Sequence, residues 1–347
     1  MALGQVALGQ VGVTPYTWED LTPLSWAVKG GQEEVVKTLL ERNDVDPTTP
    51  DGHGQTPLLI ATREGYEGIV RVLLEHNDVN PSTADRHGQT PLFIAARMGH
   101  EGIVRLLLEH DDVSPITADR HGQTPLFIAA RMGHEEIVRM LLERRDVYPN
   151  TACEYGQTQL WRAVWGGDTE MSNMPEPNNV SSNTAGDGGV TPLCIAACEG
   201  HEGVVKILLG RVDVNPNVSN GFGQTPLFGA ACEGHEAVVE MLLKRYDVDP
   251  NAPDDCGQTP LFKAACNGHA GIVRMLLKRS DLNPNITDHA GETAFSGALR
   301  HGRSPVVELL LEHRNFTLPL AGDRFTPPFS RGAYDLDQRP NKRNRRF

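Results

Sequence analysis

Apolar and polar positions along the chain follow a pattern that recurs every 34 residues. The segment Asp85–Pro115, DRHGQTPLFIAARMGHEGIVRLLLEHDDVSP, returns at Asp119–Pro149 with few changes, and Ala84–Glu101 is identical to Ala118–Glu135. Within one copy, an apolar stripe follows Thr-Pro, and a second stripe follows Gly-His at i, i+3 and i+4 spacing. This pattern predicts two amphipathic helices joined by a turn. A fixed period of this length is typical of an array of one structural unit.

The dipeptide Thr-Pro marks the start of each repeat and allows the repeats to be counted. Successive markers are separated by 34 residues, except for one interval of 33. Counting two altered copies at Thr158 and Thr293, the chain has nine repeats, and the unaltered markers begin at Thr22, Thr56, Thr90, Thr124, Thr191, Thr225 and Thr259.

The residue types inside one repeat predict where its helices begin and end. Gly88 gives the backbone freedom that a turn needs, and Thr90 is placed to cap a helix whose first residue is Pro91. That helix should end at Gly99, and His100 should open the second helix. Two helices of about eight and ten residues cannot bury enough apolar surface to offset the cost of ordering the backbone, which is roughly 1 to 2 kcal/mol per residue. Neighbouring repeats must therefore stack.

This arrangement resembles the ankyrin repeat family, whose pattern is a turn, Gly-x-Thr-Pro-Leu, a short helix, Gly-His, a second helix and an extended loop. The resemblance covers residues 18–315 and implies an all-α solenoid of nine helix-turn-helix repeats, of which the fifth is degenerate. The family's His after Thr-Pro-Leu is replaced, for example by Phe93 and Phe127, so its hydrogen bond to the capping Thr is not carried over. A Gly follows nine residues after every marker, at Gly31, Gly65, Gly99, Gly133, Gly167, Gly200, Gly234, Gly268 and Gly302.

Composition shifts predict five segments. An N-terminal leader covers 1–17, repeats one to four with the first helix of the fifth cover 18–167, and repeats six to nine cover 190–315. Between them, 168–189 is rich in Pro, Asn, Ser and Gly and lacks an apolar stripe, so the second helix is lost or reduced to one turn. Either the array breaks there into two blocks, or the loop covers the gap and one continuous arc remains. Residues 316–347 are predicted to be a disordered basic tail.

Charge and composition narrow the function classes. The net charge of −13 includes a basic tail, so the repeat body is still more acidic, which argues against nucleic acid as a partner. The N-terminus has neither a secretory signal nor a membrane helix, and the six cysteines look like free thiols. We therefore expect an intracellular, cytoplasmic monomer without a cofactor. The terminal RPNKRNRRF could be a nuclear import signal.

Two sets of positions are candidates for partner binding. In the proteins that this chain resembles, partners contact the turn tips and the outward residues of the first helix, and an aromatic residue such as Trp165 often anchors an interface. The alternative is that Arg and Lys are simply good solvated helix residues. Seven residues after each marker, the outward column includes Lys29, Arg63, Arg97, Arg131, Trp165, Cys198, Cys232 and Cys266. The turn tips of three consecutive repeats carry His53, His87 and His121.

A metal site or catalytic centre is not expected. Packed helices lie about 8 to 10 Å apart whereas zinc ligands lie about 2 Å from the ion, so one column of His or Cys cannot share a metal. The sequence has no HExxH, no CxxC and no Gly-rich loop followed by Lys. The predicted function is a non-catalytic scaffold that binds a partner protein through the concave face of the solenoid, with no small-molecule substrate. The alternatives are a targeting or regulatory protein acting through its basic tail, or a fragment of a larger multidomain protein.

Overall fold

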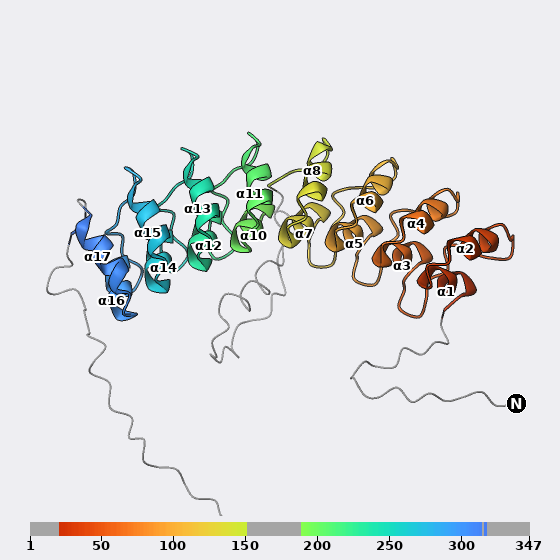
Figure 1. The fold of residues 1–347 in the computed structure, drawn as a ribbon, viewed down its shortest axis with the longest axis horizontal. Helices are drawn as coiled ribbons and strands as arrows, with labels where there is room; N and C mark the ends of the chain where they lie inside the picture. Colours follow the sequence, from red (N-terminus) through yellow and green to blue (C-terminus); the bar gives the residue numbers. More distant parts are fainter. Residues whose placement is uncertain (1–20, 151–188, 314–315, 318–347) are drawn as a thin grey trace, which may run out of the picture. The chain divides into compact units, whose positions relative to one another are not determined.

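The structure is a computed structural model that describes residues 21–150, 189–313 and 316–317. The chain divides into two compact units, Met1–Tyr148 and Pro149–Phe347, called here the N-terminal unit and the C-terminal unit. Within the described ranges every helix belongs to a helix pair and no strand occurs (Figure 1). The helices of the N-terminal unit are α1 (Pro23–Lys29), α2 (Glu33–Leu40), α3 (Pro57–Glu64), α4 (Glu67–Leu74), α5 (Pro91–Met98), α6 (Glu101–Leu108), α7 (Pro125–Met132) and α8 (Glu135–Glu143). The helices of the C-terminal unit are α10 (Pro192–Cys198), α11 (Glu202–Leu209), α12 (Pro226–Glu233), α13 (Glu236–Leu243), α14 (Pro260–Asn267), α15 (Ala270–Leu277), α16 (Ala294–Arg300) and α17 (Ser304–Glu312).

In every repeat that the structure describes, the first helix begins where the marker threonine predicts. Thr90 is extended, with φ −75° and ψ 164°, and its hydroxyl accepts a hydrogen bond from the Phe93 backbone N–H at 3.2 Å. Pro91 follows as the first helical residue, where a missing N–H costs nothing. The cap forms although the family's His is replaced, because the backbone N–H, and not a side chain, is the donor to the threonine oxygen.

A glycine in the left-handed conformation ends the helix. Gly99 has φ 82°, and the N–H of the next residue, His100, donates to the Ala95 carbonyl at 3.0 Å. Only glycine adopts this conformation without strain, so the predicted helix end is confirmed. The second helices have eight or nine residues, slightly fewer than expected, because the chain turns at once: the His110 N–H donates to the Leu107 carbonyl at 3.2 Å.

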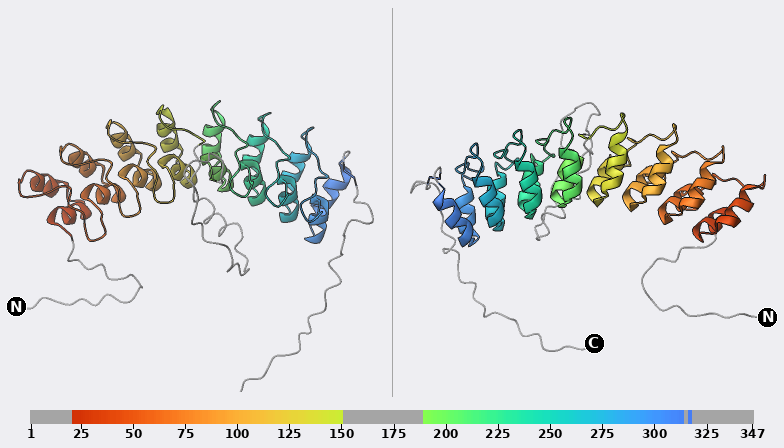
Figure 2. Two further views of the ribbon diagram at one scale, coloured as in Figure 1. Left: turned by 180° about the vertical axis from the view of Figure 1, so that it is seen from behind. Right: turned by 45° about the horizontal axis from the view of Figure 1, so that its top comes forward.

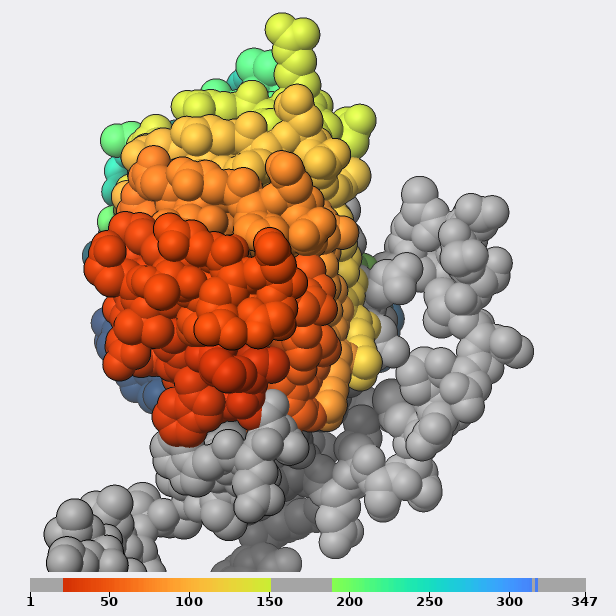
Figure 3. All heavy atoms as spheres, turned by 90° about the vertical axis from the view of Figure 1, so that its right-hand side faces the viewer, coloured from red at the N-terminus to blue at the C-terminus, as the bar shows by residue number. Residues whose placement is uncertain are grey.

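In each unit the first helices form one row and the second helices form another, as both views of Figure 2 show. The residues that face between the rows are fully buried; in the third repeat these include Leu92, Ala95 and Val104, each 0% exposed. Viewed from its N-terminal end, the N-terminal unit is a succession of thin layers, with α1 and α2 in front (Figure 3). Each layer buries its apolar stripes only against its neighbours, which is the arrangement of a solenoid.

In the third repeat a buried aspartate organises the turn before the marker. Asp85 is 8% exposed, and its carboxylate accepts hydrogen bonds from the backbone N–H groups of His87 and Gln89 at 2.8 and 2.9 Å. Gly88 adopts φ 74° at the tip, as predicted. The tips of neighbouring repeats are joined as well, because the Arg120 N–H donates to the His87 carbonyl at 3.0 Å. The turns are thus rigid platforms for the side chains at their tips.

The second helices and the loops that follow them are joined across repeats. In the C-terminal unit, Arg279 donates to the carbonyls of Leu243, Arg245 and Val248 in the preceding repeat at 3.0 to 3.2 Å, and pairs with Asp281 at 2.6 Å. These carbonyls lie at and just beyond the end of the preceding helix, where they lack helical partners. The arginine therefore satisfies backbone groups that the stack would otherwise leave unpaired.

Candidate functional site

The basic column of the N-terminal unit lies at the last turn of its first helices. Lys29 is exposed, whereas Arg63, Arg97 and Arg131 are half-buried. Arg63 lies 3.6 Å from the Asp85 carboxylate of the next repeat, measured from Nη2 to Oδ2, and the Asp85 side chain is 3% exposed. Arg97 instead donates from Nη1 to the Gln89 side chain at 3.0 Å. Arg63 and Arg97 therefore direct their guanidinium groups toward the turns and are not freely solvated.

Neighbouring cations of this column influence each other. Partial burial, and next to it the positive charge of Arg63, lower the pKa of Arg97, while Asp85 and Asp119 act in the opposite direction. Arg63 Nε is also buried without a hydrogen-bond partner in the described part of the chain. Placing like charges side by side is unfavourable unless another group compensates for them. Arg63 and Arg97 thus lie close enough together for their positive charges to oppose each other.

The turn tips of the N-terminal unit add more basic groups. His53, His87 and His121 are exposed at successive tips, and Arg86 and Arg120 are exposed beside the latter two. In the ranges the structure covers, no three His, Cys, Asp or Glu side chains come close enough together to hold a metal ion. The three histidines therefore lie on one side of the unit as separate groups.

Two exposed methionines were missed by reasoning from the sequence. Met98 and Met132 directly follow Arg97 and Arg131 and are 46% and 48% exposed. Large apolar side chains at this level of exposure, repeated at one position of successive repeats, suggest contact with something outside the chain. The signal that could have found them is their identical position, eight residues after the marker, next to the column.

In repeats six to eight of the C-terminal unit the column residues are cysteines whose thiols are packed within the stack, and in repeat nine the column residue is Arg300. Cys232 is only 8% exposed, so it offers little surface to a partner, contrary to its expected outward position. Burial raises the pKa of its thiol to about 11. A hydrogen bond with Cys194, together with burial, raises the pKa of the half-buried Cys198. Burial likewise raises the pKa of Cys266, and thiols held in the protonated form are poor nucleophiles.

The thiols of Cys198 and Cys266 occupy space that a glycine leaves open. A Cβ atom at Gly229 would collide with Cys198 Sγ, and one at Gly297 would meet Cys266 Sγ at 2.5 Å. Both glycines lie inside first helices of the following repeat, where glycine is unfavourable by about 1 kcal/mol relative to alanine. The Cys and Gly residues are therefore matched across the interface between repeats, and the five cysteines in the described ranges are free.

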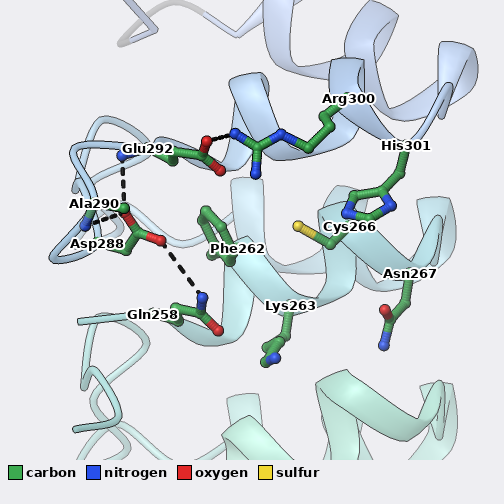
Figure 4. A pocket seen from close by; sticks show the side chains of 10 residues that line it. All are labelled: Gln258, Phe262, Lys263, Cys266, Asn267, Asp288, Ala290, Glu292, Arg300 and His301. Atoms are coloured by element: carbon green, nitrogen blue, oxygen red, sulfur yellow. Dashed lines mark hydrogen bonds and ion pairs between the residues drawn. The ribbon is translucent and has the colours of Figure 1, made fainter. Parts of the chain in front are cut away.

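One hollow lies beside the last of these thiols, at the turn side of α14 and α16 (Figure 4). It has a volume of about 460 Å³ and is lined by Phe262, Lys263, Cys266 and Asn267 of α14 together with groups of the following repeat. Side-chain interactions hold the rim of the hollow in place. Arg300 pairs with Glu292, and the side chain of Gln258, which precedes α14, donates to Asp288 of the following repeat at 3.4 Å. The hollow therefore has a fixed polar rim and an aromatic residue in its wall.

The histidines that open the second helices have a structural role. The Nε2–H of His134 donates to the Arg97 carbonyl at 3.1 Å, and that of His269 donates to the Cys232 carbonyl at 3.0 Å. Each bond joins the second helix of one repeat to the end of the first helix of the repeat before it. These side chains therefore hold the carbonyl ends of the column residues in place.

Several predictions fall outside the described residues. Trp165, the leader 1–17, all but the last residue of 168–189, and the tail beyond Thr317 belong to this group. The expected break at 168–189 and the alternative role of the basic tail thus stay predictions. Among the helices that the structure describes, none is long and apolar enough to cross a membrane.

Comparison with known proteins agrees with the helix pairs. A family model described as ankyrin repeats (3 copies) matches residues 8–85, 78–153, 116–174, 151–254 and 246–318. A comparison with curated proteins finds no match. Ankyrin repeats generally mediate protein–protein interaction and typically act as non-catalytic domains. Because the matched segments run from residue 8 to 318 and the described helices have the expected paired arrangement, the chain belongs to the ankyrin-repeat family.

Proposed function

We propose that the chain is a non-catalytic scaffold that binds a partner protein through its turn tips and the last turns of its first helices. The observation that carries this proposal is the repeated pair of a half-buried arginine and an exposed methionine, Arg97 with Met98 and Arg131 with Met132. Arginine and methionine are both enriched at protein interfaces, whereas a surface that only has to stay solvated needs no repeated apolar group.

The charges of this surface also favour a partner over solvent alone. Arg63 pairs with Asp85 of the third repeat, and that carboxylate is already hydrogen-bonded to two backbone N–H groups. Excess positive charge on one face of an otherwise acidic protein gives directionality to an encounter with a partner. In the C-terminal unit, the hollow beside Cys266 is a separate place where a side chain of a partner would fit.

Affinity capture with the full chain tests the proposal. The variant R63E/R97E/R131E reverses the column, and R71E/R105E/R139E makes the same charge change on the second helices of the same repeats. We expect specific partners of the wild-type chain to be lost from the column variant and kept by the control. If both variants fold, by circular dichroism, and capture the same proteins as the wild type, the proposed surface is wrong.

A further inference from the structure

The cations of the N-terminal unit recur with the spacing of the repeats. Arg63, Arg97 and Arg131 occupy the same position in α3, α5 and α7, and these helices pack directly on one another in that order. Neighbouring packed helices lie about 8 to 10 Å apart. A ligand that pairs with all three arginines must therefore present anionic groups on one side at that interval.

Only some peptide conformations place side chains on one side at intervals of about 8 to 10 Å. A β-strand places residues i and i+3 on opposite faces, so acidic groups at that interval point in different directions. A polyproline II helix has three residues per turn and rises about 3.1 Å per residue, so every third side chain returns to the same face after about 9.3 Å. An α-helix also meets the interval, but only with acidic residues seven apart over roughly 15 residues, and isolated helices of that length are marginal in water.

Neighbouring groups suit a proline-rich backbone. Met98 and Met132 are exposed beside two of the arginines and offer apolar contacts to residues between the acidic positions. A polyproline II backbone has no internal hydrogen bonds, so its carbonyl oxygens remain free to accept from donors at the turn tips, such as the exposed His87 ring. The same surface thus offers charge, apolar contact and hydrogen-bond donors at one repeating interval.

We propose that the N-terminal unit binds an acidic polyproline II segment that carries Asp or Glu at every third residue, one carboxylate for each of Arg63, Arg97 and Arg131. This inference rests on the proposed function and specifies its partner. A short acidic peptide fits better than a nucleic acid, because its charges lie only along the column. The chain as a whole has a net charge of −13 and would repel the part of a longer polyanion that extends beyond the column.

The binding test uses the full chain and four labelled probes in fluorescence anisotropy. The first probe repeats Glu-Pro-Pro four times, and the second has the same composition with its glutamates in one block. The third is a helical peptide with glutamate at every seventh residue, and the fourth is a single-stranded oligonucleotide. We expect the first probe to bind at least tenfold more tightly than each of the others. Equal binding of the first two, or preference for the helix or the oligonucleotide, would overturn the proposal.

Variants locate the binding on the column. In R63Q/R97Q/R131Q the charge is lost but shorter polar side chains that can still donate hydrogen bonds remain, which protects the fold near Asp85. We expect its affinity for the Glu-Pro-Pro probe to fall roughly tenfold to a hundredfold, as the loss of three partly exposed ion pairs implies. The control R71Q/R105Q/R139Q removes the same charge from the second helices and should bind within about twofold of the wild type, because screening weakens its distant effect.

Failure of this inference differs from failure of the proposed function. If captured partners depend on the column but the two proline-rich probes bind equally, the spacing argument is wrong and the scaffold proposal stands. If column variants leave both capture and probe binding unchanged, the proposed surface itself is wrong. Equal weakening by the column and control variants would mean that only net charge matters, which also overturns the inference.

Discussion

The two units solve the same packing problem with different side chains. In the N-terminal unit the column residue is an arginine, and the first helix of the next repeat carries a buried isoleucine, as in Arg63 with Ile94. In repeats six to eight of the C-terminal unit the column residue is a cysteine, and the corresponding residue of the next repeat is a glycine in two cases, as in Cys198 with Gly229. A long side chain reaches the surface and can meet a partner, whereas a short thiol fills a gap in the stack. Chemistry at one repeat position therefore depends on the residue it faces in the next repeat.

Thiol reactivity gives the largest expected effect. Because burial raises the pKa of Cys232 to about 11, the thiol should remain protonated at pH 8 and alkylate roughly a hundredfold more slowly than a free cysteine. Its rate should increase about tenfold per pH unit until pH approaches 11. Iodoacetamide labelling followed by peptide mass spectrometry measures the rate, and the same protein in urea is the control. A native rate equal to the unfolded rate would show that the column of the C-terminal unit is a reactive surface.

Replacing Gly229 with a larger residue should show that the packing of the C-terminal unit differs from that of the N-terminal unit. Gly229→Ile introduces the residue type of the N-terminal unit where Cys198 Sγ already fills the space, and should destabilise the C-terminal unit by about 2 kcal/mol. Adding Cys198→Ala should recover part of that loss. Hydrogen exchange of α10 and α12 measures the effect, with the exposed Gly210→Ile as the control. Equal effects of the two glycine substitutions would contradict the matched packing of Cys and Gly.

The arginine that joins the second helices should contribute less. Arg279→Ala removes hydrogen bonds to three backbone carbonyls from a side chain that is 17% exposed, and should lower the free energy of unfolding of the C-terminal unit by about 1 to 2 kcal/mol. Arg274→Ala on the exposed side of α15 should change it by less than about 0.5 kcal/mol. Urea denaturation followed by circular dichroism compares the two, and similar midpoints would show that the carbonyls find water instead.

The smallest effects are expected for two threonine-to-valine substitutions in the N-terminal unit, which should change its stability in opposite directions. Thr62 is 0% exposed and its hydroxyl has no hydrogen-bond partner among the residues that the structure describes, so Thr62→Val should stabilise the unit by about 1 kcal/mol. Thr90 caps α5, and Thr90→Val should destabilise the unit by about 1 kcal/mol. Thermal unfolding of both variants is the measurement. A shift of both midpoints in the same direction would mean that side-chain volume, and not hydrogen bonding, decides the result.

The helix pairs could be predicted because their signals are local. Thr90, Pro91 and Gly99 fix the first helix through backbone conformation and one hydrogen bond, and those causes lie within ten residues of each other. The same logic holds in every described repeat. Only the length of the second helices was overestimated, because the turn after Leu108 begins earlier than its apolar residues suggest.

The surface was harder to predict because its properties arise between repeats. Counting positions identified Arg97 and Cys232 as equivalent, but their exposure depends on neighbours about thirty residues away in the sequence. The hollow beside Cys266 likewise requires Gln258 and Asp288 to meet across two turns. One signal was present in the sequence. Gly229 and Gly297 interrupt segments whose other residues favour a helix, and an unfavourable glycine inside a helix often marks close packing.

The hydrogen bond from His134 to the Arg97 carbonyl has a consequence for how such a chain can grow. The equivalent bond from His100 to the Arg63 carbonyl also spans 37 residues, so the third repeat carries a donor for the repeat before it and an acceptor for the one after it. A duplicated segment of 34 residues can be inserted at such a junction without leaving either group unsatisfied. The identity of Ala84–Glu101 and Ala118–Glu135 is what a recent duplication of this kind would leave behind, and it makes the N-terminal unit a natural place to lengthen the array by design.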